Sequence, residues 1–247
     1  MTVSENFGEL YANIYDVIYK SKNYGRECDL LEKLFKNKNS VSTILDLGCG
    51  TGGHAAELSK RDYQIVGLDQ SPQMIKIAQD KKLSSCEFKL GDIRAFDINQ
   101  SFDALILMFN VIGYITDEPD LSSIFKRAQR HLGEGGLLIF DFWYAPAVRK
   151  NPPTESNQSG FYKGLDVCRR TKGKIVPDSN YVQVDCNLKH GSTTIQENHK
   201  VRFFDINELR SLLTKSGFRG INFGQMPDIS SPLSTDNWSA VAWAQIQ

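Results

Sequence analysis

Residues 44–52 read Ile-Leu-Asp-Leu-Gly-Cys-Gly-Thr-Gly, so an apolar run stops at an acid and enters a glycine-rich loop. Glycine lets a backbone turn sharply and lets a ligand approach where a Cβ would collide. A second apolar run, 65–68, ends at Asp69. Asp69 follows the loop by about twenty residues. In nucleotide-binding βαβ units, an acid at that spacing binds the ribose hydroxyls. The two features together predict a site for an adenosine-like ligand.

A dinucleotide-binding site is the rival interpretation of the same loop. It expects G-x-G-x-x-G, with a third glycine for helix–strand packing and a helix N-terminus that faces a pyrophosphate. Here the third glycine comes two residues after the second rather than three, and Asp46 stands just ahead of the loop. An acid repels a diphosphate but attracts an ammonium group. The loop therefore argues against a nicotinamide dinucleotide and suits an adenosine-like ligand that carries a cation.

Composition limits the class of protein. The 247 residues suffice for one α/β domain with an elaboration. Lys plus Arg and Asp plus Glu both number 29, so nothing resembles the basic field of a nucleic-acid binder. No apolar run is long enough for a bilayer span, and we expect no signal peptide and no membrane partner. The five cysteines are scattered without C-x-x-C, which favours a reducing cytoplasm over a disulfide frame or a metal site.

The elements that would position this loop alternate along the chain. Apolar residues recur at helical spacing within 7–40, and short apolar strands separated by helices follow from residue 43. Such strands predict a parallel sheet covered on both faces. The predicted strands are 43–47, 64–68, 86–90, 102–108 and 136–142, and the predicted helices between them are 53–60, 72–82 and 119–132.

The alternation breaks after the fifth strand. Residues 145–160 contain two prolines and a polar run and predict a loop, whereas 161–204 lack a helical period and predict an antiparallel β insertion. A helix after Asp205 and two strands near 218–224 and 238–245 complete an α/β fold with a Rossmann-like sheet of seven strands, mostly parallel with an antiparallel C-terminal hairpin. We predict an N-terminal helical lid over 1–40, a cofactor-binding α/β domain over 41–150 and 205–247, and a β insertion over 151–204 that acts as substrate cap or dimer contact.

The whole chain resembles the class I S-adenosylmethionine-dependent methyltransferases. The glycine loop, Asp69, the Gly91-Asp92-Ile93 turn, Phe102-Asp103 and the terminal hairpin stand in that family's order. The resemblance implies that Asp69 binds the ribose and that Asp92 and Ile93 frame the adenine, although a turn or cap acid also explains Asp92. S-adenosylhomocysteine would be the product. The cofactor-binding residues implied are Tyr24, Asp46, Gly48, Cys49, Gly50, Gly52, Asp69, Gln70, Asp92, Ile93 and Met108.

A narrower likeness is to the N-methyltransferases of nucleotide-linked amino sugars. It is carried by segments 15–19, 22–24, 108–114, 141–146 and 203–204. It implies that the acceptor is the amine of a dTDP-linked deoxyaminosugar. The chain departs from those enzymes in one respect, because a tyrosine replaces their histidine after the Ile-Gly pair. The alternatives are another small acceptor, such as an amino acid or a metabolite amine, and, less favoured, a tRNA.

Methyl transfer mainly requires alignment of a neutral nucleophile and exclusion of water. We hypothesise that Tyr15 and Tyr114 border the acceptor pocket and orient the amine; the alternative is that both are half-buried structural aromatics. Asn110, Trp143 and Tyr144 follow strands four and five, where open α/β sheets bind ligands, and are candidates for substrate binding. We interpret Met74 as core packing. His199, on an insertion strand, could reach the pocket, but we favour a structural role for it.

Overall fold

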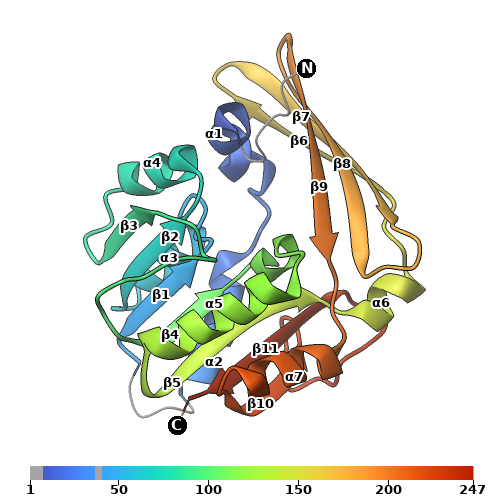
Figure 1. Cartoon of the computed structure of the whole chain (residues 1–247). Coiled ribbons are helices and arrows are strands. Elements are labelled where there is room, and N and C mark those ends of the chain that lie inside the picture. Colours follow the sequence, from blue (N-terminus) through green and yellow to red (C-terminus); the bar gives the residue numbers. More distant parts are fainter. Residues whose placement is uncertain (1–7, 37–40, 247) are drawn as a thin grey trace.

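The computed structural model describes residues 8–36 and 41–246, which form two β-sheets and the helices around them (Figure 1). The large sheet has seven strands in the order β10-β11-β5-β4-β1-β2-β3, and the small sheet has four in the order β6-β7-β8-β9. The small sheet stands beyond the carboxyl ends of the central strands, and α1 (Glu9–Ile18) lies beside it (Figure 1). In this part of the chain no helix is long and apolar enough to cross a membrane.

The large sheet confirms the predicted fold class. Its first five strands are parallel, β11 runs antiparallel to β5, and β10 runs antiparallel to β11. β1 pairs with both β2 and β4, so the strand order reverses at β1, which is the point where open α/β sheets bind ligands. The strands are β1 (Thr43–Leu47), β2 (Gln64–Asp69), β3 (Cys86–Leu90), β4 (Phe102–Leu107), β5 (Leu132–Trp143), β10 (Arg219–Gln225) and β11 (Ser239–Gln245).

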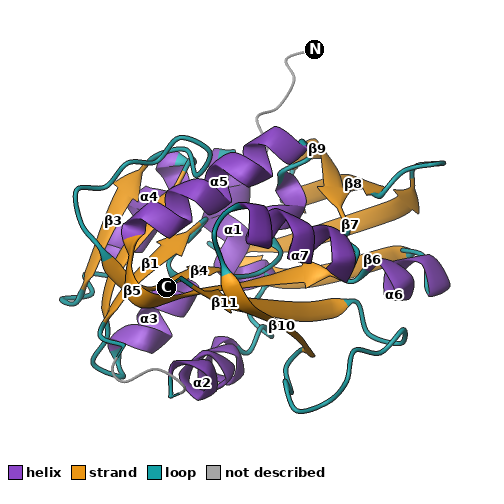
Figure 2. Ribbon diagram, turned by 60° about the horizontal axis from the view of Figure 1, so that its bottom comes forward, coloured by secondary structure: helices purple, strands orange, loops and turns teal. Residues whose placement is uncertain are grey.

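Both faces of this sheet are buried because successive side chains of a strand point to opposite sides. On β1, Ile44 packs into the core beneath one helical layer and Leu45 into the core beneath the other. Figure 2 shows α2 and α3 on one side of the sheet and α5 and α7 on the other. The helices are α2 (Tyr24–Phe35), α3 (Gly53–Ser59), α4 (Pro72–Asp80), α5 (Glu118–His131) and α7 (Ile206–Lys215).

The start of α4 shows how local sequence sets an element boundary. Ser71 precedes the helix, and its hydroxyl accepts a hydrogen bond from the Met74 N–H. Pro72 occupies the first turn, where its missing N–H has no intrahelical partner to lose. The helix therefore begins where the sequence predicts it.

The small sheet corrects one prediction. Residues 145–160 are not a loop, because they contain α6 (Ala145–Lys150) and most of β6 (Glu155–Tyr162). α6 is too short to show a period, and β6 is an edge strand whose largely exposed, polar residues resemble a loop. The remaining strands of this antiparallel sheet are β7 (Leu165–Ile175), β8 (Tyr181–His190) and β9 (Thr193–Arg202).

The two sheets are joined by a short 3₁₀ helix, η1 (Val111–Tyr114), and the residues after it. The Tyr181 hydroxyl and the Arg202 guanidinium both donate to the Thr116 carbonyl, at 2.7 and 3.2 Å. Of the predicted N-terminal lid, α1 packs against α4 and the small sheet, whereas α2 packs on α3; residues 1–7 and 37–40 lie outside the described part. The division into domains stays a prediction.

Candidate functional site

A cavity of about 780 Å³ lies at the carboxyl ends of the central strands, between the large and small sheets. Its wall combines the glycine loop, the ends of β2, β4 and β5, α1, η1 and the inner face of the small sheet. Small-molecule sites have volumes of roughly 300–1,000 Å³ and occur at such switch points in open sheets. The cavity is therefore the candidate functional site.

The glycine loop forms one end of the cavity. The N–H groups of Gly48 and Cys49 both donate to the Leu68 carbonyl, at 2.7 and 3.0 Å, which holds the loop against the end of β2. Gly48 and Gly50 have φ values of +75° and +55°. A Cβ on Gly50 would meet no atom within 4 Å, so it would extend into open space. Gly50 is thus a place where a ligand can approach the backbone.

Two buried acids stand at the ends of β1 and β2. One oxygen of Asp46, Oδ2, has no hydrogen-bond partner among the described residues, and burial raises the pKa of this carboxyl to about 6. Asp69 accepts from the N–H groups of Gly50 and Ser71, both at 2.9 Å, and burial raises its pKa. A buried carboxylate oxygen is costly to leave unsatisfied. The loop end therefore suits a ligand that brings a cationic donor.

Asp92 and Ile93 also line this end of the cavity. The Arg94 guanidinium donates to both Asp92 oxygens, with Nε at 2.9 Å from each, and this pairing holds the pKa of Asp92 below its usual range. A paired carboxylate still has acceptor capacity on each oxygen. The Asp92 side chain is consequently fixed in orientation while its remaining lone pairs stay able to accept.

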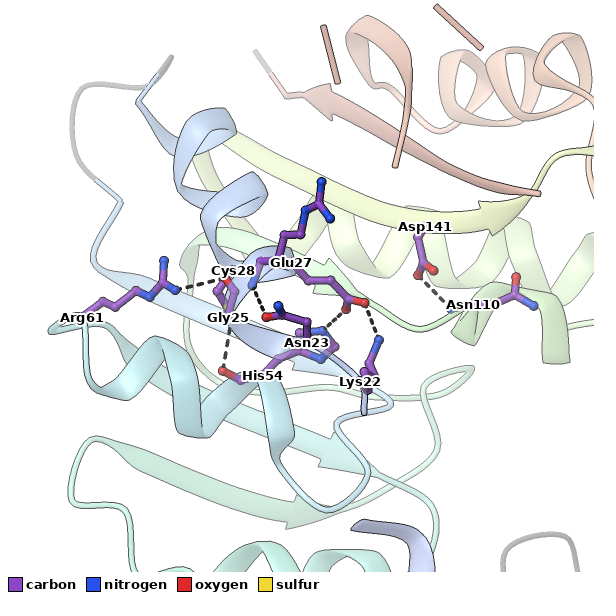
Figure 3. A network of polar contacts seen from close by, with 10 residues as sticks. Lys22, Asn23, Gly25, Glu27, Cys28, His54, Arg61, Asn110 and Asp141 are labelled. Atoms are coloured by element: carbon purple, nitrogen blue, oxygen red, sulfur yellow. Dashed lines mark hydrogen bonds and ion pairs between the residues drawn. The ribbon is translucent and has the colours of Figure 1, made fainter. Parts of the chain in front are cut away.

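Behind the loop, a polar network fixes the break between α1 and α2 (Figure 3). Glu27 accepts from Lys22 and lies 2.6 Å from His54 Nε2. The Lys22 ammonium also lies 3.9 Å from the centroid of the Phe109 ring, which lines the cavity. Tyr24 stacks edge-on against His54 at 4.9 Å. The network therefore connects the helix break to a wall of the site.

The end of β4 turns sharply toward the cavity. Phe109 and Asn110 both have left-handed backbones, with φ values of +74° and +57°. The Asn110 N–H donates to Asp141 Oδ1 at 2.7 Å, and burial raises the pKa of Asp141 to about 6. Because two consecutive non-glycine residues adopt a disfavoured conformation, the surrounding structure must stabilise this turn. It exposes the Phe109 ring to the cavity.

Aromatic side chains form a second part of the cavity wall, called the aromatic end below. Tyr15 of α1 and Tyr19, which follows the helix, have ring centroids 4.7 Å apart, and Tyr114 meets the His199 ring edge-on at 5.9 Å. Tyr114 is 41% exposed because it faces the cavity. Protein atoms around the two hydroxyl groups desolvate them and raise the pKa of both Tyr15 and Tyr114 above the usual value, so these phenols stay protonated and can donate hydrogen bonds.

Most of the predicted site residues meet at this cavity. Some predicted site residues lie outside the cavity wall. Tyr24 and Gly52 support the start of α3, and Tyr144 precedes α6 and forms a β-bridge with Phe204. Asp46 and Cys49 are buried at the glycine loop. The cavity wall includes the predicted residues Tyr15, Gly48, Gly50, Asp69, Gln70, Asp92, Ile93, Met108, Asn110, Tyr114 and Trp143.

Some wall residues were not predicted as such. Met74, interpreted as core, is buried and also lines the cavity, and His199 lines it too, which was the less favoured of its two interpretations. Asp141 could have been found, because it is an acid in an apolar strand near its carboxyl end, as Asp69 is. Arg169 and Trp238 carried no such signal, since only the packing of the small sheet and the last loop brings them here.

Comparison with known proteins agrees with this geometry. Residues 44–136 match a family model described as a methyltransferase domain. The chain is 28% identical over 192 residues to the dTDP-3-amino-3,4,6-trideoxy-alpha-D-glucopyranose N,N-dimethyltransferase of Streptomyces venezuelae, covering 76% of this chain and 74% of the relative. It is 25% identical over 216 residues to the dTDP-3-amino-3,6-dideoxy-alpha-D-glucopyranose N,N-dimethyltransferase of Streptomyces fradiae, covering 85% and 84%.

A solved structure shares the fold over nearly the whole chain. The sugar N-methyltransferase of a Streptoalloteichus species superposes with a TM-score of 0.81 at 20% identity. The superposition covers 100% of this chain and 96% of the other. The shared region includes the small sheet, so the insertion is part of a recurring architecture.

Proposed function

We propose that this chain, which is an S-adenosylmethionine-dependent methyltransferase, methylates the amine of a nucleotide-linked deoxyaminosugar. The observation that carries the proposal is the likeness to two amino-sugar N,N-dimethyltransferases over at least three quarters of the chain. A likeness of that extent covers more than the cofactor-binding half. The acceptor side of the cavity therefore falls within the compared region.

The glycine-loop end suits the cofactor. Asp46 Oδ2 is a buried acceptor without a hydrogen-bond partner in the described chain, as the methionyl ammonium requires. The open space at Gly50 leaves room for the methionyl part, and Asp69 and Asp92 offer carboxylates to the ribose and the adenine amino group. When bound, S-adenosylmethionine supplies an electrophilic methyl group on a sulfonium sulfur.

The aromatic end suits the acceptor. Tyr15, Tyr114 and Trp143 enclose a volume in which a neutral amine can be aligned with the methyl group while water is excluded. The two phenols stay protonated, so they orient the acceptor through hydrogen bonds. In this proposal the β insertion is the cap of the acceptor pocket, since β7 and β9 supply wall residues.

The direct test is product analysis. The protein is incubated with S-adenosylmethionine and dTDP-3-amino-3,6-dideoxy-alpha-D-glucopyranose, and mass spectrometry detects one or two added methyl groups on the sugar. The matched control replaces the amine of this sugar nucleotide by a hydroxyl, which is a poor nucleophile without a strong base or a metal. Methylation of free amino acids or of tRNA, with none of the sugar nucleotide, contradicts the proposal.

A further inference from the structure

β9 carries a buried carboxylate–imidazole pair at the edge of the cavity. Glu197 and His199 are each only 2% exposed, and they are two residues apart on a strand, so both side chains face inward. His199 Nε2 lies 3.1 Å from a Glu197 carboxylate oxygen. His199 is also part of the cavity wall. The pair is therefore placed to act on a bound acceptor.

The groups around this pair come from three neighbouring elements. Tyr114 of η1 stacks edge-on against His199, with ring centroids 5.9 Å apart. Cys186 of β8 stands opposite Glu197 in the antiparallel register. Arg169 of β7 lies in the same cavity wall and interacts with Cys186 and Tyr114. Tyr11 and Tyr19 interact in turn with Arg169, so the pair stands in a cluster of titratable groups.

The buried Glu197 carboxylate needs a compensating positive charge or hydrogen-bond donor, and the His199 imidazole can provide it. Burial of a carboxylate is unfavourable unless a cation or hydrogen-bond donors compensate it, and neither Glu197 oxygen has a hydrogen-bond partner in the described chain. The Glu197 carboxylate lies within ion-pair distance of the His199 imidazole. An adjacent carboxylate favours the protonated form of an imidazole. The Glu197 carboxylate is therefore placed to stabilise a proton on the His199 imidazole, whereas desolvation raises the pKa of the neighbouring Tyr114 phenol and keeps it protonated.

We propose that His199, supported by Glu197, accepts the proton that the acceptor amine releases before methyl transfer. The inference rests on the proposed function, because it requires an amine acceptor. The N–H bond of the acceptor's ammonium breaks, its electron pair stays on nitrogen, and the proton bonds to the imidazole. The nitrogen lone pair then forms the bond to the methyl carbon, and the electron pair of the breaking C–S bond stays on sulfur.

This assignment places the base next to Tyr114. Tyr114 follows the Ile-Gly pair of η1, and desolvation raises the pKa of its phenol, so the tyrosine itself stays protonated. The structure brings an imidazole from β9 into contact with that same tyrosine ring. His199 consequently offers a base next to Tyr114 from a different part of the chain.

The experiment measures kcat at saturating sugar nucleotide from about pH 5 to pH 9, a range that spans an imidazole and an amine. The acceptor is dTDP-3-amino-3,6-dideoxy-alpha-D-glucopyranose. For His199→Gln we expect kcat at pH 7 to fall about 100-fold, and the acid limb of the profile to move to higher pH, toward the amine's own pKa. His190→Gln is the matched control, because His190 lies on the same sheet outside the cavity wall and contacts the Tyr162 carbonyl.

Glu197→Gln provides an independent prediction. Without the carboxylate the imidazole is a weaker base, so the acid limb should move to lower pH, opposite to the shift in His199→Gln. Calorimetry with S-adenosylmethionine checks that both variants bind the cofactor within about twofold of wild type. A purely structural role would lower kcat without moving the limbs in opposite directions.

The outcomes separate this inference from the proposed function. If wild type methylates the sugar nucleotide and both variants keep its profile shape, or if the cofactor affinity falls together with kcat, His199 is not the proton acceptor and only this inference fails. If wild type gives no product with the amino sugar, the proposed function itself fails. Opposite shifts of the two acid limbs with unchanged cofactor binding support the assignment.

Discussion

The two ends of the cavity are built in different ways. The loop end is formed by the carboxyl ends of β1 and β2 and the turns that follow them, so its groups lie close together in the sequence (Figure 1). Much of its shape is backbone, including the positive φ at Gly50 and the N–H that Gly50 donates to Asp69. The aromatic end is formed by side chains of α1, η1, β7, β9 and the last loop.

Because they are built differently, the two ends of the cavity should tolerate different amino-acid substitutions. A wall made of backbone depends on conformations that only some residues adopt, so substitutions there should lower cofactor affinity without changing which acceptor is used. Where the wall consists of side chains from separate elements, single residues can be substituted without altering the glycine loop. We expect acceptor choice to be set at the aromatic end, and the following predictions test that separation.

The largest effect is expected for Gly50→Val. Its Cβ would enter the open space at the loop, and its φ of +55° is unfavourable for a branched residue. We expect S-adenosylmethionine affinity to fall by at least about 100-fold, which is about 2.7 kcal/mol. Gly164→Val is the control, because Gly164 also has positive φ and empty surroundings but lies in the β6–β7 turn. Calorimetric affinity within tenfold of wild type for Gly50→Val would contradict the prediction.

Asp46→Asn tests the electrostatics of the loop end. The Asp46 pKa is about 6 in the folded protein against about 3.9 in an unfolded chain, so ionised Asp46 destabilises the native state above pH 6. This penalty fades as the pH falls from about 6 to 4. The difference in unfolding free energy between variant and wild type should therefore change by about 2 kcal/mol between pH 8 and pH 4.

Urea titrations of the protein without cofactor measure that change. Asp185→Asn, an exposed position on the small sheet, should show no comparable pH dependence. The same Asp46 variant should bind S-adenosylmethionine more weakly at pH 8, because the ammonium loses its counter-charge. A pH-independent difference in stability would show that Asp46 does not carry the buried charge.

Removal of single hydroxyl groups tests the aromatic end. For Tyr15→Phe and Tyr114→Phe we expect turnover of the amino sugar nucleotide to fall about tenfold, the value of one hydrogen bond, with cofactor affinity unchanged. Tyr63→Phe is the matched control, because Tyr63 is partly buried against the core near Glu32 and lies outside the cavity wall. Full turnover in both pocket variants would refute their role in orienting the acceptor.

The smallest effect is expected at the joint between the sheets. Tyr181→Phe removes the 2.7 Å hydrogen bond to the Thr116 carbonyl but keeps the Arg202 contact. We expect a loss of about 1 kcal/mol in unfolding free energy and a higher KM for the acceptor, with cofactor affinity unchanged. Equal loss of affinity for both ligands would show that the two ends are not separate.

Prediction from the sequence succeeded where structure is local. β1 spans Thr43–Leu47 and β3 Cys86–Leu90, as the apolar runs predict, and the Ser71–Pro72 start of α4 follows from capping chemistry. It failed at β6, because an edge strand exposed along most of its length has no apolar alternation to detect. Short-range patterns report on burial, so an element that is scarcely buried is invisible to them.

The residues of the candidate site likewise divide into those that local sequence predicts and those that it does not. Gly48, Gly50 and Asp69 could be identified from residue types and spacing, because a βα turn and the acid after the next strand are fixed relative to each other by neighbouring strands. The placement of His199 beside Tyr114, and of Arg169 and Trp238 in one wall, depends on how the small sheet docks. That docking rests on contacts between residues far apart in the chain, which no local pattern encodes.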